Sequence, residues 1–121
     1  MTNSTETSWF LANVVERGED PGRLHDNPKR RCFTWVNTLL IKASSPSEAY
    51  DKAMRIAKKR YPLQYVAIAG NTIRWTVLGL SDLNPIDEDL KDGSEISWND
   101  MGYISAKRSS SMVRSKRQLT A

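Results

Sequence analysis

The chain has 121 residues, a length that suits one domain of ordinary size and leaves no room for a second hydrophobic core. With 18 Lys and Arg, 14 Asp and Glu, one His and one Cys, the composition excludes a disulfide scaffold and any zinc site built only from His and Cys. No apolar run approaches the roughly 18 residues that a membrane span needs, and the N-terminus lacks the pattern of a signal peptide. We therefore expect a soluble, cytoplasmic protein.

The positive charge is concentrated at the C-terminus. Residues 1–105 hold 13 basic and 14 acidic side chains, a net charge of −1, whereas residues 106–121 hold five basic side chains and no acid, a net charge of +5. The last segment is rich in Ser and poor in large apolar residues. We predict a single domain over residues 1–105 followed by a flexible basic tail over residues 106–121. The tail is either a solubilising terminus or a contact for nucleic acid or an acidic partner.

The N-terminal part of the chain predicts two strands joined by a long loop. Residues 8–17 carry apolar side chains at both odd and even positions and no helix start signal, which indicates a strand that is apolar on both faces. Residues 18–31 hold two Pro and two Gly among charged residues, so they form a loop. Residues 32–43 are rich in β-branched and aromatic side chains and predict a second strand, antiparallel to the first.

Several independent signals place a helix over residues 46–60. Ser45 can cap its N-terminus, Pro46 suits its first position, and Glu48 completes a Ser-x-x-Glu capping box. Three cations occupy the last turn, where they complement the helix dipole, and Pro62 prevents continuation. A narrow apolar stripe lets this helix lie close to a sheet; it consists of Ala49, Ala53, Ile56 and Ala57.

The C-terminal half predicts two further strands. Residues 72–80 alternate apolar and polar side chains, which is strand periodicity. An acidic stretch then leads through a turn at Gly93 to a last strand over residues 94–98, with an extension over residues 101–104. The predicted order is β-β-α-β-β, an α+β fold in which one helix packs on a small, mainly antiparallel four-stranded sheet.

Elementary geometry suggests that this sheet is incompletely covered. A helix is about 10 Å wide, whereas four strands spaced about 4.8 Å apart make a sheet roughly 20 Å wide. The four Trp residues fall one to each predicted strand, so they either fill the core or offer a partner surface. We take as candidate partner contacts three of these Trp residues and three acids, namely Trp35, Trp75, Trp98, Asp87, Asp89 and Asp92.

Three stretches of the sequence resemble a known family. They are ASSPSEAYDKA from Ala43, IRWTVLGLSDL from Ile73 and DEDLKDGSEIS from Asp87, the last containing the pattern L-x-D-G-[ST]-E at Leu90 to Glu95. Together they resemble the small bacterial family catalogued as domain of unknown function 4288, over about residues 8–98. The resemblance implies the same domain boundaries and β-β-α-β-β order. Because the activity of that family is unknown, it implies no catalytic residue.

No arrangement of residues points to catalysis or to a metal. Cys32 lies seven residues after His25, and Asp26 follows His25 directly, but this spacing matches no signature of a catalytic nucleophile. A Cys at the start of a strand is typically a small hydrophobic residue. The acids after residue 86 lack the spacing of a calcium loop, and no phosphate-binding glycine motif is present. We therefore expect no enzyme activity, no cofactor, no metal and no small-molecule ligand.

Two hypotheses for function lead, and a hydrolase that uses the acidic stretch with Asp87, Asp89 and Asp92 is a third alternative. The first is a protein-binding module whose partner is another protein or a second copy of the chain, for example a bacterial immunity or regulatory protein. The second is nucleic-acid binding without membrane contact, through basic residues of the loop and the tail. The candidate contacts for nucleic acid or an acidic partner are Lys29, Arg30, Arg31, Lys107, Arg108, Arg114, Lys116 and Arg117.

Overall fold

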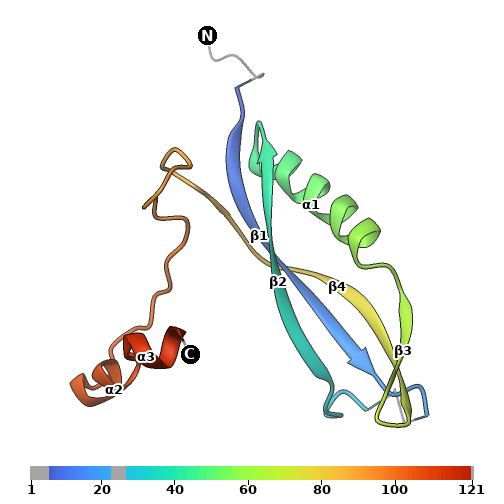
Figure 1. Ribbon diagram of the computed structural model, residues 1–121. Helices are drawn as coiled ribbons and strands as arrows, with labels where there is room; N and C mark the ends of the chain where they lie inside the picture. Colours follow the sequence, from blue (N-terminus) through green and yellow to red (C-terminus); the bar gives the residue numbers. More distant parts are fainter. Residues whose placement is uncertain (1–5, 23–26, 121) are drawn as a thin grey trace.

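A computed structural model describes residues 6–22 and 27–120 (Figure 1). A twisted four-stranded sheet carries one long helix, and the chain then leaves the sheet and ends in two short helices (Figure 1). The elements in chain order are β1 (Ser8–Glu19), β2 (Phe33–Ala43), α1 (Pro46–Arg60), β3 (Gln64–Ile68), β4 (Asn71–Pro85), α2 (Ala106–Ser111) and α3 (Lys116–Thr120). The predicted α+β class and β-β-α-β-β order are confirmed.

The strands lie in the order β2-β1-β4-β3, and every neighbouring pair is antiparallel. β1 pairs with β2 without interruption from Ser8–Ala43 to Gly18–Phe33. Its pairing with β4 shifts register twice, between Asn13 and Val14 and between Val15 and Glu16. Each shift adds one residue to β4, so the two together restore the alternation of its side chains.

The fourth strand is not the one that the sequence predicted. Residues 94–98 and 101–104, expected as the last strand and its extension, form no strand. The sheet is completed instead by β3, which forms a hairpin with β4 through Ala69 and Gly70. The prediction for residues 94–98 was wrong because β4 continues to Pro85, well past the predicted end at residue 80, and its N-terminal half already pairs with β3.

Helix α1 packs on one face of the sheet, which we call the helix face. The helix begins and ends at the predicted residues, Pro46 and Arg60. Its buried alanines lie against the even-numbered side chains of β1 and the odd-numbered side chains of β2, which face the same side because opposed residues of a strand pair do so. This core consists of Phe10, Ala12, Ile41, Ala43, Ala49 and Ala53, with Leu39, Ile56, Leu80 and Leu83 packed around it. The small alanines allow the close approach that the sequence predicted.

Candidate functional site

The face of the sheet opposite α1, which we call the open face, keeps apolar side chains at its surface. The odd-numbered residues Leu11, Asn13 and Val15 of β1 lie on it and are only partly buried. On β2, Val36 is 51% exposed and Leu40 is 48% exposed. Among the described residues, no helix packs on this face.

The chain that follows β4 turns back toward the open face. Ile86 is buried, and its backbone N–H donates to the carbonyl of Trp9 at 2.8 Å, which fixes the end of β4. A tight turn then closes around Ser94, whose N–H donates to the Lys91 carbonyl at 3.0 Å and whose hydroxyl accepts from the Lys91 N–H at 3.0 Å. Gly93, where the sequence predicts a turn, lies inside this loop.

Two adjoining hollows lie between the returning segment and the sheet. One has a volume of about 480 Å³ and the other about 470 Å³, and they share Asp82, Asn84, Ser97 and Trp98. We call the combined depression the acidic groove. Its lining includes the carboxylates Asp82, Asp87, Glu88, Glu95 and Asp100.

The chemistry of the groove is anionic with an aromatic wall. The described residues that line the two hollows include no Lys or Arg, while Leu11 and Ile96 add apolar surface. Trp98 is 76% exposed. No group of three or more His, Cys, Asp or Glu side chains within the described part of the chain is placed to hold a metal ion. The arrangement suits a cationic ligand with an apolar portion, because carboxylates attract the charge and an exposed indole packs on the carbon chain.

The six predicted partner contacts do not form one site: two line the acidic groove, two lie on the adjoining turn, and two lie on the other face of the sheet. Trp98 and Asp87 line the acidic groove, whereas Asp89 and Asp92 lie on the adjoining turn and outside its lining. Sequence reasoning missed Asp82 and Asn84. They occupy alternate positions of β4, so both side chains lie on the open face. The alternation of side chains along a strand would have predicted this if the predicted strand had been extended beyond residue 80.

Trp35 and Trp75 lie together on the helix face, beyond the end of α1. Their rings stack with centroids 4.6 Å apart, and Phe33 meets both edge to face. Trp75 is 7% exposed, so it offers little surface, while Trp35 is 48% exposed. The buried carboxylate of Glu16 accepts hydrogen bonds from the Trp35 indole N–H at 2.9 Å and from the Asn37 amide. This carboxylate fixes the position of the Trp35 ring.

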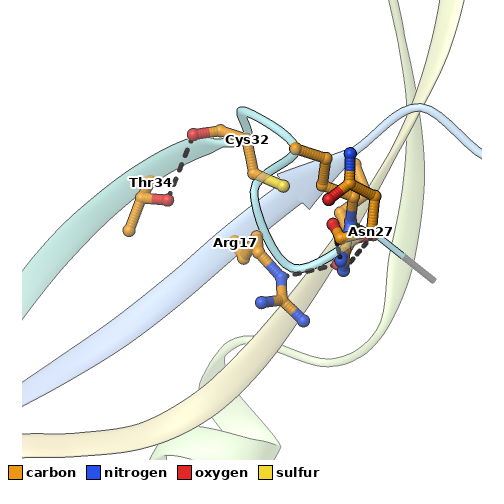
Figure 2. A network of polar contacts seen from close by, with 6 residues as sticks. Arg17, Asn27, Cys32 and Thr34 are labelled. Carbon is orange, nitrogen blue, oxygen red and sulfur yellow. Dashed lines mark hydrogen bonds and ion pairs between the residues drawn. The ribbon is translucent and has the colours of Figure 1, made fainter. Parts of the chain in front are cut away.

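The three basic residues of the loop, Lys29, Arg30 and Arg31, have different environments. The backbone carbonyl of Asn27 accepts a hydrogen bond from the backbone N–H of Arg30 at 3.1 Å, which closes a turn. The Arg30 guanidinium donates to the buried carboxylate of Glu19 at 3.1 Å. Arg17 lies 2.6 Å from the same carboxylate (Figure 2). Arg30 therefore serves the fold, while Lys29 and Arg31 are exposed.

Cys32 is a free, partly buried cysteine at the start of β2, and its carbonyl accepts the Thr34 hydroxyl at 3.2 Å (Figure 2). His25 and Asp26, weighed above as companions of this thiol, lie outside the described residues.

The tail residues Lys107, Arg108, Arg114, Lys116 and Arg117 lie on or between α2 and α3 and are all exposed. Neither helix buries a residue or contacts another element, and both lie apart from the sheet (Figure 1). The mobility of this tail stays a prediction. Within the described residues, no helix has the length and apolarity to cross a bilayer.

Fold and groove together define a small α+β module whose antiparallel sheet is covered by a helix on one face only. Residues 9–98 match the family model described as Domain of unknown function (DUF4288), and the chain belongs to this family. The match ends at Trp98, so it includes most of the groove and leaves out the basic tail. No curated protein and no solved structure matches the chain.

Proposed function

We propose that the protein is a non-enzymatic, cytoplasmic protein-binding module that holds a cationic segment of a partner protein in the acidic groove. The observation that carries this proposal is the lining of the groove, which as far as the structure describes it combines five carboxylates with an exposed Trp and contains no Lys or Arg. Trp is enriched among the residues that dominate binding energy at interfaces, and complementary charge speeds association and selects the partner. A bacterial immunity or regulatory protein, which blocks or tunes its partner, is one form of such a module.

The geometry favours a segment of a protein over a small molecule. The two hollows are open and continuous with the apolar open face, so a ligand that extends from the groove onto Leu11 and Leu40 buries more apolar surface than one confined to the hollows. A Lys-rich or Arg-rich segment with apolar side chains between its cations meets both requirements.

The test compares affinity capture by matched variants in the cells that produce the protein. The groove variants are Trp98→Ala and the pair Asp82→Asn with Asp87→Asn. The control is the pair Asp89→Asn with Asp92→Asn, which removes the same charge from the neighbouring turn outside the groove. We expect a partner that the parent and the control capture equally and that both groove variants lose, with binding that weakens as salt rises. Equal capture by all four proteins contradicts the proposal.

A second candidate function is nucleic-acid binding through the tail. The observation that favours it is that five cations lie on exposed, solvent-facing segments that make no contact with another element of the fold. Such cations are available to phosphates, and their contacts are insensitive to sequence and strongly weakened by salt. Deleting residues 106–121 tests it.

A further inference from the structure

Strand β2 forms an open edge of the sheet. Within the described part of the chain it has a neighbouring strand on one side only, and it pairs with β1 along its whole length without a bulge. From Phe33 to Ile41 it contains no charged residue and no Pro. Native proteins normally interrupt an edge with charges, Pro, bulges or a short strand, because an unpaired ladder binds any other extended strand. β2 has none of these devices over this stretch, whereas β3 at the other edge is only five residues long.

Two hydrogen bonds establish which backbone groups of β2 point outward. The Trp9 carbonyl accepts from Ile86 on the β4 side, so Trp9 directs its backbone groups away from Lys42, its partner on β2. Antiparallel pairs alternate between hydrogen-bonded and non-bonded, so the even-numbered residues of β2 direct their N–H and C=O groups outward. The Lys42 carbonyl agrees with this assignment, since it accepts from the Lys52 ammonium at 2.7 Å.

The edge that is left for a partner strand is short and uncharged. With Lys42 engaged by Lys52, the outward residues are Thr34, Val36, Thr38 and Leu40. Apolar side chains are exposed on both faces beside this ladder: Phe33 (66%) and Trp35 on the helix face, Val36 and Leu40 on the open face. The occupant must therefore be an extended, uncharged strand with apolar groups on both sides.

β2 of a second copy meets these conditions. A two-fold axis through Asn37 pairs Thr34 with Leu40 of the other copy and Val36 with Thr38, which uses all four outward residues and leaves the contact between Lys42 and Lys52 intact. No like charges are opposed in this register. On the helix face, the exposed Phe33 and Trp35 come to lie opposite Ile41 and Leu39 of the other copy, beside the start of its α1.

We propose that the protein associates with itself by antiparallel pairing of β2 from two copies, which makes one continuous eight-stranded sheet with both α1 helices on the same face. The pairing is symmetric, as closed dimers of identical chains require. It uses the backbone edge of β2, where Thr38 is shared with the lining of the groove, and it does not use the groove residues Asp87 and Trp98.

The first test measures oligomeric state by light scattering and sedimentation across the micromolar to millimolar range. The parent protein should show a concentration-dependent dimer. Val36→Pro removes one outward N–H, which β1 does not use, and Pro is tolerated at such positions of an edge strand. We expect it to weaken dimerisation roughly tenfold or more. The matched control Val36→Thr keeps the N–H and the β-branched shape and should dimerise like the parent.

A pair of variants with opposite charges at Thr38 tests whether β2 of the second copy is the partner strand. This test does not depend on whether the Pro variant folds. Thr38 is exposed, and in this register its two copies are diagonal neighbours, roughly 7–8 Å apart. Thr38→Lys alone and Thr38→Glu alone should each weaken self-association roughly tenfold, and their mixture should restore the dimer. The neutral control Thr38→Gln should behave like the parent.

The proposal is overturned by a parent protein that stays monomeric throughout the range, by a folded Val36→Pro variant that dimerises like Val36→Thr, or by Lys and Glu variants that do not associate when mixed. Val36→Pro and Trp98→Ala separate this interface from the groove, because Trp98→Ala leaves the edge of β2 unchanged and Val36 is not among the residues that line the groove. Thr38 lines one of the two hollows, so its variants test the interface through the oligomeric state alone.

Discussion

Gly18 lies where β1 passes beneath the Trp75 ring. It is opposed to Phe33 on one side and to Trp75 on the other, and a Cβ atom at this position meets Trp75 Cζ2 and Cη2 and Ile73 Cγ2, each at 3.0 Å. The missing side chain lets the indole lie flat over the strand, where Trp35 stacks on it. The glycine is required here by close packing.

Gly18→Ala is therefore expected to lower the free energy of unfolding by about 1–3 kcal/mol, because the added Cβ displaces the Trp75 ring, which is stacked on Trp35. Denaturant unfolding followed by Trp fluorescence measures the loss. Gly22→Ala is the control, since Gly22 is exposed and among the described residues the Cβ there meets the Asp20 carboxylate at 3.3 Å. Equal stabilities for the two variants contradict the close-packing argument.

Glu16 is a buried carboxylate that holds this aromatic cluster in place through hydrogen bonds. A carboxylate that is only 6% exposed is costly to bury unless hydrogen bonds replace its water. Here one oxygen of Glu16 accepts from both Trp35 and Asn37, and both donors come from β2. The carboxylate therefore ties β1 to the edge strand through side chains as well as through the backbone ladder.

At the scale of elements, the start of α1 combines two caps. The Ser45 hydroxyl accepts the Glu48 N–H at 3.1 Å, as the capping box predicts. The Glu48 carboxylate reaches one residue further than the box requires and accepts from the hydroxyl and the N–H of Ser44. These bonds, the Ser44 hydroxyl first, together with the nearby Lys52 charge, hold the pKa of Glu48 below its ordinary value of 4.5.

A lowered carboxyl pKa gives the cap a defined pH dependence. The unfolded chain binds this proton more readily than the folded protein does, so the charged Glu48 stabilises the fold fully above pH 4.5, and the contribution is lost as the pH falls through the lower, folded pKa. Glu48→Gln should therefore melt at a lower temperature than the parent at neutral pH, with the difference vanishing in acid. The control Asp51→Asn removes a charge from the same helix without touching the cap. A difference between parent and Glu48→Gln that is the same at every pH counts against this mechanism.

The elements differ in how far their sequences predict them. Helix α1 is predicted to the residue because its cap, its alanine stripe and its stop signal are all local. β3 is not, since QYVAI is short and the hairpin that follows uses Ala69 with φ 51° and Gly70 with φ 82°. Two positive φ angles define the turn that favours Asn-Gly, and Ala in its first position gives no such signal. Pairing with β4 therefore overrides a weak local preference.

The candidate site was predicted only in part for a related reason. Trp98 and Asp87 were singled out as surface residues, but their partners Asp82 and Asn84 come from a strand whose end the sequence does not mark. β4 runs through two irregularities in its pairing with β1, and these break the simple alternation that strand prediction relies on. A groove between a strand and a returning irregular segment depends on tertiary contacts that no local pattern encodes.

At the scale of the whole molecule, the tail and the body are separate. α2 and α3 have six and five residues, too few to be stable as isolated helices, and no element of the body packs on them. Their caps are local: the Ser105 hydroxyl accepts the Arg108 N–H, and Ser115 and Gln118 bond each other reciprocally. The tail has a net charge of +5, whereas residues 1–105, which include the acidic groove, have a net charge of −1.

Deleting residues 106–121 should therefore separate two properties. The free energy of unfolding should stay within about 0.5 kcal/mol of the parent, because every residue of the segment that the structure describes is exposed. By contrast, Ile86→Ala, at a buried position just after β4, should cost about 2–4 kcal/mol in the same assay.

If the tail binds nucleic acid, fluorescence titration of labelled single-stranded and double-stranded DNA and RNA at about 50 and 200 mM salt should show affinity that falls steeply with salt in the parent and is lost on deletion.

The two readouts of this deletion decide between the functions of the tail. Unchanged stability with lost, salt-sensitive binding assigns nucleic-acid contact to the five tail cations. Unchanged stability with no binding by the parent at low salt removes the nucleic-acid candidate and leaves the acidic groove as the site of function. A loss of stability on deletion contradicts the separation of tail and body itself, because it requires contacts between α2 or α3 and the sheet that the fold does not contain.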